Sequence, residues 1–205
     1  MRGLARLHQF GNRQANGEAL RLFNSAIVLD PEFATAYGRA AFCYLVARIN
    51  GWIPDTAHAI AEVKKLTQRA VELGKDDATA LSASGNALAF VVGDVGVDAG
   101  LVDRALALNS NLAEAWNFGG WVKIWLGEPE AAIERFARAL RLSPLDPWLM
   151  AMRAGTAYAH FFWTAMTKRH HGRPWHCSAV RTINLDYASP PQATQWPVGR
   201  SKQTR

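Results

Sequence analysis

The residues with the clearest potential for chemistry lie near the C-terminus. His170 and His171 are followed by His176 and Cys177, and imidazole and thiolate groups are common zinc ligands. Their spacing matches no usual zinc pattern, however, and no second ligand pair follows. We therefore expect no metal site and no cofactor.

A second candidate is the short loop Gly93-Asp94-Val95-Gly96, because glycine-rich loops can cradle phosphates. It lacks the following Lys-Ser/Thr pair, and it lies between two predicted helices rather than after a strand. The sequence also holds no nucleophile–base arrangement and no helical His/Glu metal motif. We therefore predict no catalytic residues and no enzymatic activity.

The elements that must position any site are helices that recur at a regular interval. The motif Ala-hydrophobic-x-Leu, followed by a residue that ends the helix, starts at Ala26, Ala70, Ala105 and Ala139. Successive starts are 44, 35 and 34 residues apart. A period near 34 built from helix-forming residues is typical of a solenoid of helical hairpins. Such solenoids usually present a binding surface.

The clearest repeat spans residues 113–146. One predicted helix ends at Gly127, since glycine tolerates the left-handed conformation of a helix C-terminus, and Pro129 suits the first turn of the next. That second helix carries an apolar stripe on one face, and Ser143-Pro144 ends it. The unit resembles the tetratricopeptide repeat (TPR), with a departure at Gly119, where the family has leucine. The matching residues are Trp116, Gly120, Gly127, Ala132, Phe136, Ala139 and Pro144.

The other units are less regular. Residues 1–31 begin inside a first helix, the next unit holds an insertion near 50–55, and residues 148–162 form the first helix of a fifth unit. We therefore predict an all-α fold, a right-handed TPR superhelix of about four antiparallel helical hairpins over residues 1–162. Its first and last units are incomplete, and a largely disordered tail follows.

A closer resemblance covers residues 1–162. Residues 18–23, 29–34, 50–52 and 89–94 are similar to the C-terminal TPR region of bacterial class III adenylate cyclases. This resemblance implies a signalling module, and it carries no catalytic residue because the cyclase domain is absent from this sequence.

Residues 163–205 differ from the repeats in charge. Residues 1–162 carry 16 Lys/Arg and 16 Asp/Glu, whereas residues 163–205 carry 7 Lys/Arg and one acid, Asp186. We expect this basic, irregular tail to be a separate region. One explanation is a frameshift, because a shifted reading frame permits TPR-like helices starting at Trp163 and Pro197, one repeat apart. The other is a genuine basic, disordered tail.

The candidate binding residues come from the first helix of each repeat, since in TPRs that helix lines a concave groove. Apolar anchors flanked by amides suit an extended peptide. Trp121 and Trp125 share one helix face, and the alternative is that these tryptophans only fill the core between helices. The predicted groove residues are Phe42, Asn86, Phe90, Asn117, Trp121 and Trp125, with Leu45, Val46 and Ser82 on the same face.

Together these features predict a protein–protein interaction scaffold, a truncated remnant of a cyclase-like signalling protein that binds a protein or peptide segment in its groove. The alternative is an adaptor that binds nucleic acid or an anionic membrane through the tail. We expect no specific nucleic-acid binding, no membrane span and, with two distant cysteines, a cytoplasmic location. The bare face of the last helix predicts self-association.

Overall fold

The computed structural model describes residues 2–53, 56–93 and 95–169. All regular structure in these ranges is helical, which confirms the all-α prediction. The elements are α1 (Arg2–Leu7), α2 (Arg13–Leu29), α3 (Ala34–Ile49), α4 (Thr56–Leu73), α5 (Ala78–Ala87) with the π-helical turn η1 (Leu88–Val92), α6 (Val95–Leu108), α7 (Ala113–Trp125), α8 (Pro129–Leu142) and α9 (Leu149–Arg169).

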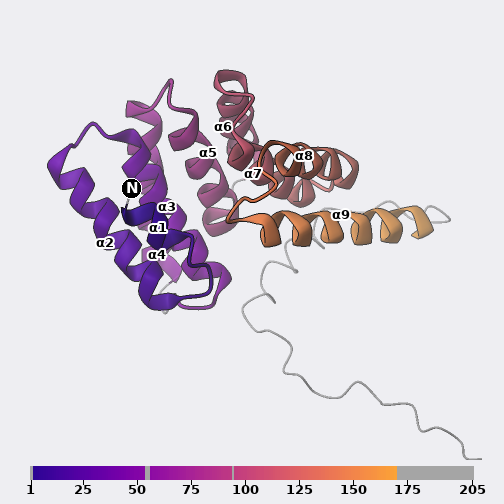
Figure 1. The fold of residues 1–205 in the computed structure, drawn as a ribbon, viewed down its shortest axis with the longest axis horizontal. Helices are drawn as coiled ribbons and strands as arrows, with labels where there is room; N and C mark the ends of the chain where they lie inside the picture. The colour runs from indigo at the N-terminus through magenta and orange to yellow at the C-terminus, as the bar shows by residue number, and fades with distance from the viewer. Residues whose placement is uncertain (1, 54–55, 94, 170–205) are drawn as a thin grey trace, which may run out of the picture.

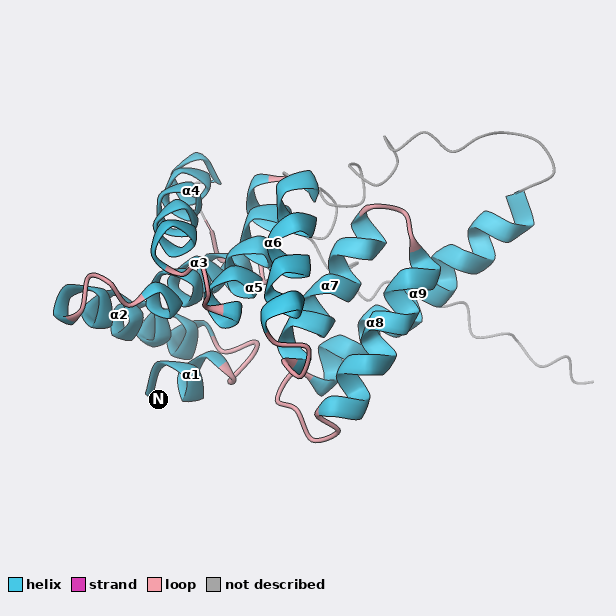
Figure 2. Cartoon of the chain, turned by 90° about the horizontal axis from the view of Figure 1, so that it is seen from above, coloured by secondary structure: helices cyan, strands magenta, loops and turns pink. Residues whose placement is uncertain are grey.

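Neighbouring helices pair as hairpins, and the hairpins follow one another along the molecule (Figure 1). The pairs are α1/α2, α3/α4, α5/α6 and α7/α8, and α9 stands as the first helix of a further unit. Figure 2 shows the succession from above, with α1 and α2 at one end and α8 and α9 at the other. The first helices α3, α5 and α7 pack side by side and form one layer.

Local signals in the sequence fix several helix ends. The Asp77 carboxylate caps α5 by accepting hydrogen bonds from the backbone N–H groups of Thr79 and Ala80 at 2.9 and 3.0 Å. Gly127 adopts a left-handed φ of 76° after α7, and Pro129 opens α8, as the sequence predicts. The repeat boundaries therefore follow from short-range chemistry.

Phe136 of α8 holds the last two units together. Its ring is fully buried and lies against Gly120 of α7 and Gly155 of α9. A Cβ atom at position 120 would come within 2.6 Å of the ring, so only glycine permits this approach. Small residues on the first helices thus let α8 sit close to both α7 and α9.

The helical structure extends further than the sequence predicts. We placed the end of the last helix at Phe162, but α9 continues to Arg169. The reason is that no glycine or proline occurs between Phe162 and Gly172 to end the helix. Residues 170–205, and with them most of the predicted tail, lie outside the described residues.

Replacing Phe136 with alanine tests the packing between units. We expect Phe136→Ala to lower the free energy of unfolding by about 3–5 kcal/mol, because the ring fills the space between three helices and leaves a cavity when removed. Urea unfolding followed by circular dichroism measures the change. The control Leu145→Ala removes an exposed side chain and should change stability by less than about 0.5 kcal/mol. Equal effects of the two substitutions would contradict this account of the core.

Candidate functional site: an apolar groove closed at one end

The inner face of the helical layer encloses a groove of about 280 Å³. All six residues predicted to bind a partner line it: Phe42, Asn86, Phe90, Asn117, Trp121 and Trp125. They come from α3, from α5 with η1, and from α7, so three successive first helices contribute to one concave surface. Whether this surface binds a partner stays a prediction.

Burial divides the lining into a floor and a rim. The floor consists of side chains that are almost fully buried, and it includes Phe42, Leu45, Asn86, Asn117, Phe118 and Trp148. The rim is a row of half-buried aromatic rings, Phe90, Trp125, Trp121, Tyr158 and Phe162, whose successive centroids lie 5.5 to 6.4 Å apart. These spacings are typical of interacting aromatic pairs, so the rim is a continuous apolar edge.

A local irregularity shapes this rim. The helix α5 changes at Leu88 into the π-helical turn η1, which ends at Gly93 in a left-handed conformation with φ of 83°. Such turns widen a helix and are frequent at functional sites. Phe90 lies inside η1, with its ring 5.5 Å from that of Trp125.

Two amide side chains on the floor each have a carbonyl oxygen without a hydrogen-bond partner. Asn86 is 4% exposed and Asn117 is 2% exposed, and the Oδ1 atom of each accepts no hydrogen bond from any described residue. A buried carbonyl oxygen left without a donor costs about 1–3 kcal/mol. Both oxygens are enclosed by the protein and have almost no accessible surface, so each is an unsatisfied group of the packed floor.

Trp148 lines the groove where the first and last units meet. The backbone N–H of Trp148 donates to the Asp146 carboxylate at 2.8 Å, which holds the turn before α9. The indole then stands edge-on to Phe42 of α3 at 5.5 Å and to Phe10 of the α1–α2 loop at 5.3 Å. The first and the last units therefore touch across the concave face.

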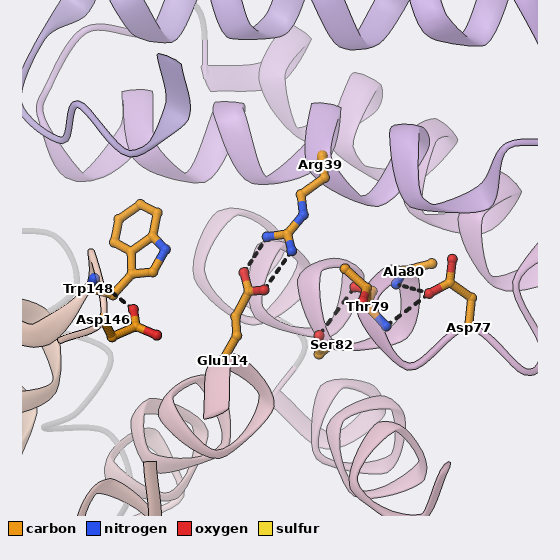
Figure 3. A network of polar contacts seen from close by, with 8 residues as sticks. All are labelled: Arg39, Asp77, Thr79, Ala80, Ser82, Glu114, Asp146 and Trp148. Carbon is orange, nitrogen blue, oxygen red and sulfur yellow. Dashed lines mark hydrogen bonds and ion pairs between the residues drawn. The ribbon is translucent and has the colours of Figure 1, made fainter. Parts of the chain in front are cut away.

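An ion pair between α3 and α7 also connects units that are not adjacent, and Figure 3 shows this pair. The guanidinium of Arg39 on α3 forms a two-pronged contact with the carboxylate of Glu114 in the first turn of α7, although the two helices belong to units that are not consecutive. Burial disfavours the Arg39 charge, but the Glu114 carboxylate, together with smaller contributions from Cys43 and Asp77, outweighs that effect and raises the Arg39 pKa above its ordinary value. Arg39 therefore stays charged, and its contact with Glu114 fixes the distance between α3 and α7.

Charge is absent from the groove itself. Among the described residues, no Lys, Arg, Asp or Glu contributes to its lining. The sequence likewise predicts no basic set of the kind that would clamp a carboxylate. The groove therefore offers aromatic and aliphatic surface with two amides, and no partner for a charged group.

The sequence analysis missed part of the lining. Val46 and Ser82 are buried but do not reach the groove, whereas Phe10 and Trp148 do, from segments outside the repeating first helices. One side of α9 also lines it, through Ala151, Ala154, Tyr158 and Phe162. The spacing of these four residues on one helix face was visible in the sequence. Phe10 and Trp148, in contrast, reach the groove only because the first and last units meet.

The rest of the described chain offers little other chemistry. It contains no group of three or more His, Cys, Asp or Glu residues placed to hold a metal ion. The candidate ligands His170, His171, His176 and Cys177 lie outside the described residues. None of the described helices has the length and hydropathy that crossing a membrane requires.

The comparisons with known proteins identify the fold. No family model and no curated protein matches the chain. A thermophilic TPR protein of Thermus thermophilus superposes with a TM-score of 0.55 at 18% identity, over 70% of this chain and 72% of the other. The MamA protein gives a TM-score of 0.48 at 19% identity over 85% and 84% of the two chains. YrrB, a TPR protein with an unusual peptide-binding site, gives 0.40 at 21% identity over 69% and 84%.

The similarity to the thermophilic protein, together with the observed hairpins, shows that this chain has a TPR fold, as predicted. The two similarities below a TM-score of 0.5 add nothing to that conclusion. None of the comparisons supports the resemblance to the adenylate cyclase region.

Removing one partner of the buried ion pair tests the closure. We expect Arg39→Met to lower the free energy of unfolding by about 3–5 kcal/mol, because it leaves the Glu114 carboxylate without its counter-charge. Adding Glu114→Leu should recover most of the lost stability, since two apolar side chains need no counter-charge. Urea unfolding measures both variants.

The control for that experiment is Arg69→Met. Arg69 forms an exposed pair with Glu72 at 3.3 Å, which water screens, so its loss should hardly change stability. A double variant no more stable than Arg39→Met would show that the pair does not act as a unit.

Cys43 provides a test of burial next to the groove. Burial raises the pKa of the Cys43 thiol to about 12, against a smaller opposing effect of Arg39. The folded thiol therefore stays protonated at neutral and mildly alkaline pH, and only the thiolate is nucleophilic. In a Cys177→Ser variant, which keeps only Cys43, we expect no reaction with a disulfide reagent at about pH 8 until urea unfolds the protein. Fast reaction of the folded protein would place Cys43 at the surface instead.

Proposed function

We propose that this chain is a protein–protein interaction scaffold that binds an extended peptide segment in its concave groove. The observation that carries the proposal is the convergence of residues from three successive first helices on one apolar cavity. A concave surface built from first helices is the usual binding face of helical solenoids.

The groove has the features of a peptide-binding surface. Large aromatic side chains contribute most of the binding energy in protein interfaces when they lie next to desolvated pockets, and here they form both floor and rim. The binding would therefore rest mainly on the burial of apolar surface.

The proposal does not include catalysis. The described residues bring no nucleophile and base together in the groove, and the fold is the scaffold type that the sequence predicts. We further propose a cytoplasmic location, on the basis of the two distant cysteines, and an origin in a cyclase-like signalling protein, on the basis of sequence resemblance alone.

Self-association through α9 is a second part of the proposal. The helix α7 packs against both the preceding α6 and the following α8, whereas α9 packs against α8 and α7 and no described helix follows it. Met150 and Phe161 on the outer face of α9 are 74% and 68% exposed. Burying these side chains against a second molecule would remove apolar surface from water.

A matched pair of phenylalanine substitutions tests the groove. Peptides are first selected from a displayed library of random peptides on the full-length protein, and their affinity is measured by calorimetry. We expect Phe90→Ala to weaken a selected peptide at least about tenfold, because Phe90 forms the rim. Phe33→Ala, which removes an exposed phenylalanine outside the groove, should leave the affinity unchanged.

The same peptides distinguish the groove from the tail. Replacing the basic tail residues Arg173, Arg181, Arg200, Lys202 and Arg205 with glutamine should not affect binding. Binding that survives Phe90→Ala but disappears in this tail variant would refute the groove proposal and favour the alternative adaptor function.

A further inference from the structure

The last helix carries a row of apolar side chains on the side that points away from the body of the protein. The row consists of Met150, Ala154, Ala157 and Phe161, and all four residues are exposed. Their spacing of 4, 3 and 4 residues places them on one face of α9. We call these four residues the outer row.

The opposite face of α9 packs on the body. Met152, Gly155 and Ala159 are buried there, and Gly155 lies against the ring of Phe136. The helix stands at the end of the succession of helices, as Figure 2 shows, and no described helix follows it. The outer row is therefore accessible along its whole length.

The outer row has the pattern of a helix-pairing seam. Apolar residues that alternate in spacing between four and three form the contact between two helices of a coiled coil. Here the side chains at the two ends of the row are large, and the two in the middle are alanines, which allow two helix backbones to approach closely. The row therefore fits another helix better than it fits a flat surface.

The outer row is complementary to a reversed copy of itself. The order large, small, small, large is the same in both directions along the helix. An antiparallel copy therefore sets Met150 opposite Phe161 and Ala154 opposite Ala157, and it makes each contact twice. A two-fold symmetric dimer requires this kind of self-complementary surface, in which residue i contacts residue j and residue j contacts residue i.

The charge of the chain favours the antiparallel orientation over the parallel one. A parallel pair would bring the two C-terminal ends of α9 within about 10 Å of each other. The region that contains these ends, residues 163–205, carries 7 Lys/Arg and one acid, so two copies side by side would repel each other. The antiparallel pair separates the two ends by about 40 Å along the helix axis. That distance is several times the screening length of about 8 Å at physiological salt.

The residues beside the row are compatible with such a contact. Arg153 and His160 are exposed next to it, and side chains of this type can cover an apolar seam while their polar ends stay in water. A contact of one helix face on each side belongs to the small interfaces, below about 1,200 Å², which are typical of weak complexes. We therefore expect a dimer that dissociates on dilution.

We propose that two copies of this chain pair antiparallel through α9, with Met150 of each copy against Phe161 of the other and with Ala154 and Ala157 in close contact between them. This inference rests on the proposed self-association, and it specifies the partner, the contact residues and the register. The exposed apolar face of α9 is then buried in the dimer.

Sedimentation velocity of the full-length protein over a series of concentrations tests the surface. We expect Met150→Glu and Phe161→Glu each to weaken the dimer at least about tenfold, because each places a carboxylate against an apolar partner. The control Val28→Glu changes an exposed residue of α2, at the other end of the molecule, and should leave the dimer unchanged. A wild-type protein that stays monomeric would overturn this inference and the self-association together. Dimers that survive both α9 substitutions would show that the protein associates through another surface.

Disulfide cross-linking tests the register. In a Cys177→Ser background, Met150→Cys protein is mixed with Phe161→Cys protein under mild oxidation, and mass spectrometry distinguishes the three possible products. We expect the mixed product, because the two positions face each other and the second Met150–Phe161 contact stays intact. Two copies of position 150 lie about 16 Å apart along the antiparallel pair, too far for a disulfide.

The other cross-linking results contradict the antiparallel register. Cross-linked homodimers of Met150→Cys or Phe161→Cys would indicate a parallel pair, and the absence of any product would exclude the proposed contact. Either result would overturn this inference while leaving self-association through α9 intact if the glutamate variants dissociate. The control mixture of Val28→Cys with Phe161→Cys should give no product, since Val28 lies on α2, far from the pairing surface.

Discussion

The contact between α3 and α7 is the interaction on which the groove depends. In a simple solenoid each repeat touches only its neighbours, so the width of the concave face is set by the sum of many small rotations. Here Arg39 reaches Glu114 in a unit that is not adjacent, and beside them the rings of Phe42 and Phe118 stack with centroids 5.0 Å apart. A buried, two-pronged ion pair has strict geometry, so it fixes the separation that the repeats alone would leave variable.

This closure also explains why the aromatic residues serve two purposes. Trp121 lies against Phe136 in the core and against Tyr158 on the rim, so it is both a core residue and a groove residue. The same is true of Phe42, which packs on Phe118 and forms the floor. Because one ring fills the core on one side and lines the groove on the other, the groove is as rigid as the core that supports it.

The two sets of buried polar residues on the concave side have different effects on the protein. The Arg39–Glu114 pair is buried and satisfied, so it contributes a fixed geometry. Asn86 and Asn117 are buried with their carbonyl oxygens unsatisfied, so they lower the stability of the protein. The outer face of α9 presents a third case, in which apolar side chains stay exposed because no described helix covers them.

Most of the fold was predictable from the sequence because it follows from local chemistry. The repeat period, Gly127 with Pro129 and the small residues opposite Phe136 predict the hairpins, and the face of each first helix predicts the six groove residues. The end of α9 was predicted too early, since no residue between Phe162 and Gly172 breaks a helix.

Tertiary structure alone decided the rest. Which helix Arg39 reaches, and that Trp148 and Phe10 meet across the concave face, depend on how rotations add up over several repeats. A repeat pattern describes each unit and its contacts with adjacent units, but it carries no information on contacts between units that are farther apart. The sequence by itself thus determined the helices and the face that forms the groove, while the contacts between distant units became visible only in the folded chain.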